Sequence, residues 1–142
     1  MSIRPAVLAC LLLGAAPAYA QTAENDAPSL GLELNAMQNV ESACRLTFVA
    51  QNRTGTEIEK AVFETVIFDT SGGVISLSLF DFRDLPSGRP RVRQFDLAGM
   101  GCDTIGQTLI NGASTCLVDG SESDICDRAL LLSSRMDVEL LG

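Results

Sequence analysis

The stretch that decides the fold runs from Val62 to Phe82 and reads VFETVIFDTSGGVISLSLFDF. Two runs of β-branched and aromatic residues flank a polar segment with Gly72 and Gly73, and glycine supplies the positive φ that a tight reversal needs. This pattern predicts a β-hairpin. Alternation in its second run places three aliphatic residues on the core side: Ile75, Leu77 and Leu79. The phenylalanines that follow are expected to change sides at a bulge or at the strand end.

Short alternating segments recur along the rest of the chain, with turn signals about every ten residues and no convincing helical period. The expected strands include 30–34, 43–51, 58–68, 91–97, 105–110 and 115–118, and a last element over 130–141. A turn or single helical turn is expected over 35–41, a turn at 111–112 and a polar loop over 119–127. Together these segments predict an all-β fold, a single antiparallel immunoglobulin-like β-sandwich of about seven or eight strands.

The first twenty residues have the pattern of a cleaved secretory signal. Arg4 precedes an apolar run, and the run ends in the small-x-small motif Ala18-Tyr19-Ala20. The run is shorter than the ~20 residues that a membrane-spanning helix needs. We therefore expect a signal peptide over 1–20, a flexible leader over 21–29 and a β-sandwich domain over 30–142. The expected location is the periplasm, with no membrane insertion after cleavage.

The charge balance and the absence of His exclude several classes of function. The chain has 18 acidic and 10 basic side chains, and loss of Arg4 with the signal leaves nine basic side chains and a formal charge of −9. Such an excess of acid disfavours nucleic acid as a partner. Without His, a Ser-His-Asp or Cys-His nucleophile cannot be built. The neighbouring carboxylates of Asp81 and Asp84 are expected to be solvated, so we expect no enzyme and no cofactor.

Four cysteines remain once Cys10 leaves with the signal: Cys44, Cys102, Cys116 and Cys126. An even number of cysteines in an exported chain predicts two disulfides. A zinc site is disfavoured, because the chain has no Cys-x-x-Cys pair and no His.

One set of residues resembles a known family. In chain order these residues are Phe48, Asn52, Val62, Ile67-Phe68-Asp69, Gly73-Val74-Ile75, Leu85-Pro86, Gly88 and Phe95. The order resembles the FxLYD-type domain, a small immunoglobulin-like sandwich of exported bacterial and archaeal proteins, over Cys44 to Leu97. Phe68 stands where the family name carries Tyr, and the cysteines lie largely outside the match. The whole chain also resembles small uncharacterised periplasmic proteins of alphaproteobacteria. These resemblances imply a fold and a compartment, and no activity.

Four cysteines allow three pairings, and an immunoglobulin-like strand order favours one of them. In that order the strand of Cys44 runs antiparallel to the 91–97 strand, which brings Cys44 beside Cys102. The preferred pairing is therefore Cys44–Cys102 with Cys116–Cys126, the second bridge enclosing the acidic loop.

The candidate partner-binding residues are Arg89, Arg91 and Arg93, which alternate along a segment interrupted by Pro90. Proline disfavours a central place in a sheet, so this segment is expected at an edge. Three exposed guanidinium groups there would pair with carboxylates of a partner, and the strand would accept an extended peptide. The simpler interpretation is that charge and proline protect the edge strand against aggregation.

These observations favour an exported, non-enzymatic β-sandwich module that acts in protein association or in accessory support of a cell-envelope complex. The alternative is a periplasmic protein that binds a small ligand or calcium. Asp119 to Asp127 concentrates oxygen ligands that suit calcium, although it lacks the spacing of a known calcium loop.

Overall fold

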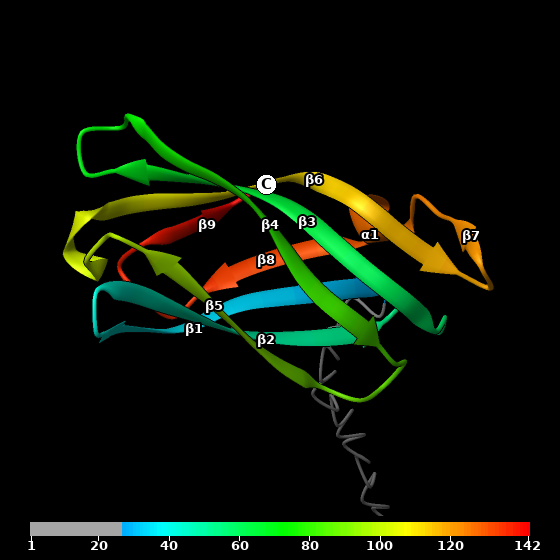
Figure 1. Ribbon diagram of the computed structural model, residues 1–142. Coiled ribbons are helices and arrows are strands. Elements are labelled where there is room, and N and C mark those ends of the chain that lie inside the picture. The colour runs from blue at the N-terminus through cyan, green and yellow to red at the C-terminus, as the bar shows by residue number, and fades with distance from the viewer. Residues whose placement is uncertain (1–26) are drawn as a thin grey trace, which may run out of the picture.

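The computed structural model describes residues 27–142, which form two β-sheets packed face to face (Figure 1). The first sheet has the strand order β5-β2-β1-β8, with β1 Ser29–Val40, β2 Ala43–Arg53, β5 Arg91–Ala98 and β8 Leu130–Ser134. The second has the order β4-β3-β6-β7, with β3 Ile58–Asp69, β4 Val74–Leu85, β6 Ile105–Val118 and β7 Ser121–Glu122, and β9 Glu139–Leu141 also pairs with β6. A short 3₁₀ helix, η1, spans Cys102–Thr104, and the helix α1 spans Ile125–Arg128. The prediction of an all-β sandwich is confirmed, with nine strands among these residues.

Most neighbouring strands are antiparallel, but two pairs are parallel. β8 lies parallel to β1 in the first sheet, and β9 lies parallel to β6 in the second. The segment after α1 thus contributes one strand to each sheet, where a single last element was expected. The predicted signal peptide lies outside the described residues, as do residues 21–26 of the predicted leader, and Ser29 already belongs to β1. No helix of residues 27–142 is long and apolar enough to cross a bilayer.

The predicted hairpin is present as β3 and β4, joined at Asp69–Gly73. The Asp69 carboxylate accepts hydrogen bonds from the backbone N–H groups of Ser71 and Gly73, both at 2.9 Å. Because these bonds favour the charged form, they lower the pKa of Asp69, with the Gly73 bond as the largest cause. Gly72 has a φ of +89°, a conformation that glycine adopts without steric cost.

The orientation of β4 is the reverse of the predicted one. Leu77 and Leu79 are 60% and 61% exposed, whereas Phe80 and Phe82 are buried. The strand keeps one alternation from Ile75 to Phe82, so the half-buried serines lie on the inner side with the two rings. The inward rings of Phe80 and Phe82 pack edge to face on Phe48, and Phe80 also stacks on Phe95, contacts that aliphatic side chains cannot make.

Three further predicted boundaries are wrong. β1 continues to Val40 through an irregularity between Leu34 and Ala36, where a turn was expected. β6 runs unbroken through Asn111 and Gly112, because register shifts against β3 absorb these residues without a chain reversal. The predicted acidic loop contains β7 and α1.

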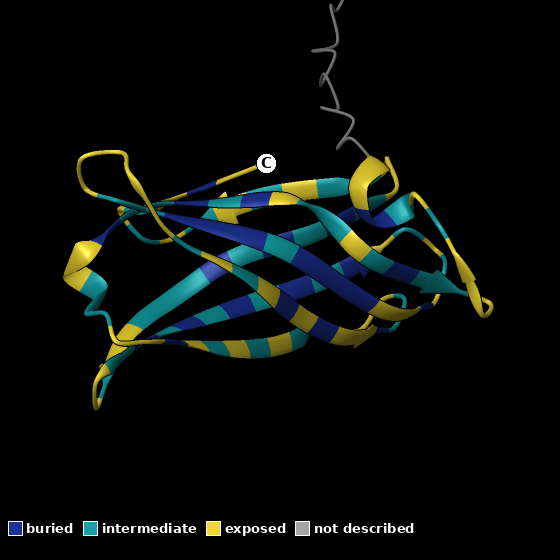
Figure 2. Cartoon of the chain, turned by 45° about the horizontal axis from the view of Figure 1, so that its top comes forward, coloured by how far each residue is buried: buried dark blue, intermediate teal, exposed yellow. Residues whose placement is uncertain are grey.

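The core lies between the sheets (Figure 2). Buried residues alternate with half-buried ones along β2, whereas β3 is buried at several consecutive positions. Phe48 of β2 occupies its centre and makes edge-to-face contacts with Phe80, Phe82 and Phe95, at centroid distances of 5.5 to 6.0 Å. Phe80 and Phe95 stack at 4.2 Å. These rings join β4 to β5, the two strands at one side of the sandwich.

Asn52 anchors the loop between β4 and β5. Its side chain is 1% exposed, and Nδ2 donates to the carbonyls of Thr56 and Leu85, both at 2.7 Å. Its own backbone carbonyl accepts a hydrogen bond from Gly88 at 2.8 Å. The buried amide therefore holds the end of β4 and the loop after it against β2.

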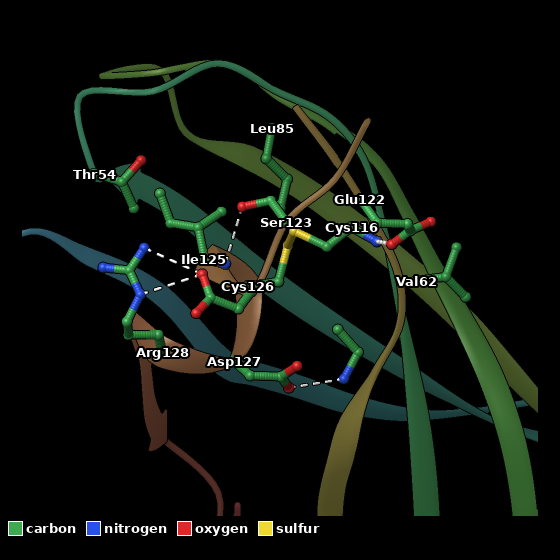
Figure 3. Close-up of a disulfide and its surroundings, with 12 residues drawn as sticks. Thr54, Val62, Leu85, Cys116, Glu122, Ser123, Ile125, Cys126, Asp127 and Arg128 are labelled. Atoms are coloured by element: carbon green, nitrogen blue, oxygen red, sulfur yellow. Dashed lines mark hydrogen bonds and ion pairs between the residues drawn. A yellow bond between two sulfur atoms is a disulfide. The ribbon is translucent and has the colours of Figure 1, made fainter. Parts of the chain in front are cut away.

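Both disulfides have the predicted pairing. Cys44–Cys102 joins the start of β2 to η1, and Cys116–Cys126 joins β6 to α1 (Figure 3). The first closes a sequence separation of 58 residues and the second one of 10. On a chain-entropy model, loops of these lengths stabilise the fold by about 4 and about 3 kcal/mol.

Candidate functional site

The predicted arginine strand is an edge strand, as expected. β5 is the first strand of its sheet and pairs only with β2 in the described part of the chain. Its outer side therefore leaves N–H and C=O groups without strand partners. Arg91 and Arg93 share the inward side of β5 with Phe95 and Leu97, so they lie at the rim between the two sheets.

The Arg93 side chain is mostly buried and bonded within the protein. The expectation that all three arginine side chains are exposed is therefore wrong. Its side chain is only 11% exposed, and Nε donates to the carbonyl of Phe82 at 2.6 Å. One terminal nitrogen donates to the carbonyl of Asp84 at 3.0 Å and contacts its carboxylate at 3.3 Å. Burial lowers the pKa of the guanidinium, and the nearby charge of Arg83 lowers it further. This side chain joins β5 to the end of β4.

Arg91 is half-buried and contacts the Asp84 carboxylate at 3.5 Å. Arg89, in the loop before β5, is exposed, and its guanidinium has no hydrogen-bond or ion-pair partner among residues 27–142. Of the three predicted residues, Arg89 is thus the one whose charge is most available to a partner.

The structure adds Arg83, which sequence reasoning missed. Arg83 lies near the end of β4 at a bulge, with φ +59°, and its exposed guanidinium has no partner in the described part of the chain. The sequence does contain a signal for including Arg83 in this group. Arg83 is near the end of β4 and Arg89 just before β5, and the short loop between these strands must bring their ends together. We call the group Arg83, Arg89, Arg91 and Arg93 the basic edge.

A shallow depression of about 500 Å³ lies beside the basic edge. Its lining is mostly charged and polar: Arg45, Arg83, Val92, Arg93, Gln94 and Asp96. Arg45 and Asp96 form a two-bond ion pair at 2.7 and 2.9 Å across β2 and β5. The hydrogen bond from Arg45 lowers the pKa of Asp96, and the same contact raises the pKa of Arg45. Arg45 and Asp96 therefore neutralise each other within this lining, whereas Arg83 has no partner among residues 27–142.

The acidic side chains considered as catalytic or calcium-binding groups have structural contacts. Asp81 accepts from the backbone N–H of Arg83 at 2.8 Å, and Asp84 contacts Arg91 and Arg93. In the acidic loop, three carboxylates have partners: Glu122 with the Cys116 N–H, Asp124 with Arg128, and Asp127 with the Ala113 N–H (Figure 3). Within residues 27–142, no three His, Cys, Asp or Glu side chains gather as a metal site. No observation favours the calcium hypothesis.

Comparisons with protein-family models, curated proteins and solved structures find no match for this chain. The resemblance to the FxLYD-type domain therefore stays a prediction.

Proposed function

We propose that this protein is an exported, non-enzymatic β-sandwich module that binds another protein of the cell envelope through its basic edge. The observation that carries the proposal is a contrast of charge. Four of the ten Lys and Arg side chains of the chain lie between positions 83 and 93, against 18 acidic side chains in the same sequence. Arg91 and Arg93 lie on β5, an edge strand, and Arg83 and Arg89 lie just before it, near the end of β4 and in the loop between the two strands.

The geometry favours a partner that presents carboxylates on an extended segment. Such a segment would pair with the free backbone groups of β5 and place its acidic side chains on Arg83 and Arg89. Arg91 and Arg93 already have intramolecular partners, so they position the edge rather than supply its free charge. Two disulfides support the compartment in this proposal, because such bridges persist in oxidising surroundings such as the periplasm.

The test is recovery of partners from periplasmic extract by wild-type protein and by a double variant, Arg83→Glu with Arg89→Glu. We expect wild type to retain a partner at low salt and to lose it as salt screens the charges, and we expect the double variant to bind poorly at every salt concentration. The matched control is Arg128→Glu with Arg135→Glu, which changes the net charge equally at two exposed sites on either side of β8, at the opposite end of the first sheet from β5. Equal recovery by all three proteins, with unchanged circular dichroism, would reject the basic edge as the binding surface.

A further inference from the structure

The most exposed apolar segment of the described chain is the first half of β4. Val74, Ile75, Leu77 and Leu79 are between 40% and 62% exposed. Leu77 begins an apolar row across the outer face of the second sheet. Register pairs it with Val66 of β3, which pairs with Leu109 of β6, and this residue pairs with Leu141 of β9. Val66 is buried beneath its neighbours in this row, so the apolar surface that is open to a partner lies mainly along β4, and exposed apolar surface marks interaction sites on soluble domains.

The same segment is an open strand edge. β3 is the only described strand that pairs with β4. No other element of residues 27–142 donates to or accepts from the backbone of residues 74–80. The unpaired part of the β4 edge is bounded at one end by the Asp69–Gly73 turn. At the other end it is bounded by the hydrogen bonds from Arg93 to the carbonyls of Phe82 and Asp84. Seven residues, Val74 to Phe80, therefore form a free edge centred on Leu77.

This edge lacks the protection that β5 has. β5 carries Arg91 and Arg93 and follows Pro90, whereas residues 70–80 contain no charged residue and no proline. A long, uncharged, apolar edge aggregates unless another strand covers it. Any strand that covers this edge must approach a protein with a net negative charge. Two copies of this acidic chain would repel each other least where the uncharged residues 70–80 of each copy meet.

We propose that a second copy of this chain covers the edge, with the two β4 strands antiparallel about a two-fold axis at Leu77. This inference does not depend on the basic edge. The axis places Leu77 against Leu77 of the second copy, Ile75 against its Leu79, and Ser76 against its Ser78. Asp81 then lies opposite Gly73 of the second copy, beyond the apolar pairs. Moving the axis to residue 79 would set Asp81 against Leu77, so the charges disfavour that register.

The paired edge joins the two second sheets into one continuous sheet and extends the apolar row through both copies. A two-fold arrangement also limits assembly to a dimer, because each copy uses its single open β4 edge. Salt should strengthen this association by screening repulsion between the acidic chains, whereas it should weaken binding at the basic edge. The opposite salt responses make the two proposals separable.

The test is sedimentation of the exported protein over a range of concentrations, at low and high salt, for wild type, Leu77→Arg and Leu131→Arg. Leu131 is the matched control, since it is 61% exposed on β8, an edge strand of the other sheet. We expect a wild-type dimer, a dissociation constant raised roughly tenfold or more in Leu77→Arg, where like charges would face each other, and a constant near the wild-type value in Leu131→Arg.

Oxidative crosslinking tests the position of the axis. Leu77→Cys should form a covalent dimer, because directly opposed strand residues lie within disulfide distance, whereas Leu131→Cys should not. A protein that is monomeric at all concentrations overturns the proposal. A dimer that survives Leu77→Arg, or that crosslinks through position 131 and not 77, also overturns it. Capture of an unrelated extended chain by a monomer would do the same, and none of these outcomes bears on the basic edge.

Discussion

Gly106 lies in β6 where this strand passes the backbone of the Asp69–Gly73 turn. A Cβ atom at this position would meet the Asp69 carbonyl oxygen and would lie 2.8 Å from the carbonyl carbon of Asp69 and 2.9 Å from the Cα of Thr70. Because backbone atoms cannot yield as a flexible side chain does, Gly106→Ala should lower the free energy of unfolding by about 1–3 kcal/mol. Urea denaturation measures this loss.

Gly31→Ala is the matched control for that prediction. Gly31 also lies in a strand, and the nearest atom to its added methyl group would be the Gln51 carbonyl oxygen at an ordinary 3.7 Å. Alanine there should be neutral or stabilise the protein by up to about 1 kcal/mol. Equal losses in the two variants would contradict the close approach of β6 to the turn.

The need for glycine at position 106 cannot be predicted from local sequence. The glycines of the hairpin turn are predictable, because two apolar runs flank them and the reversal itself needs a positive φ. Gly106 has neither signal, since its constraint comes from a turn more than thirty positions earlier in the chain.

At the scale of elements, Arg93 joins the two sheets at the β4–β5 side. Removing it leaves the carbonyls of Phe82 and Asp84 without their charged donor, at a site that is mostly shielded from water. We expect Arg93→Ala to lower the free energy of unfolding by about 1.5–3 kcal/mol. Arg89→Ala, an exposed change four positions away, should stay within about 0.5 kcal/mol of wild type. Similar urea midpoints for the two variants would show that Arg93 is not the joining residue.

The edge position of β5 was predictable, but the roles of its arginines were not. Pro90 next to an alternating run is a local signal, because proline in a sheet is confined to edge strands, strand starts and bulges. Which arginine is free depends on where the carbonyls of β4 lie. That placement follows from the orientation of β4, where Phe80 and Phe82 turn inward and leave Leu77 and Leu79 outside.

At the scale of the whole molecule, the sandwich and its disulfides were predictable because many observations agree on them. Strand alternation, turn spacing and an even cysteine number all indicate one bridged β-sandwich. The parallel strands β8 and β9 were not foreseen, since a parallel partner lies far away in sequence and leaves no hairpin signal. The apolar row from β4 to β9 exists only once the strand order is known.

The central claim is that the basic edge contacts a partner in the envelope, and site-specific photocrosslinking tests it most directly. A photoreactive residue placed at position 83 or 89 of the exported protein, and irradiated in the periplasm, should yield a discrete higher-mass adduct with another protein. The same residue at position 135, exposed and just after β8 at the opposite edge of the first sheet, should yield none. Adducts from position 135 alone, or equal adducts from all three positions, would contradict the account.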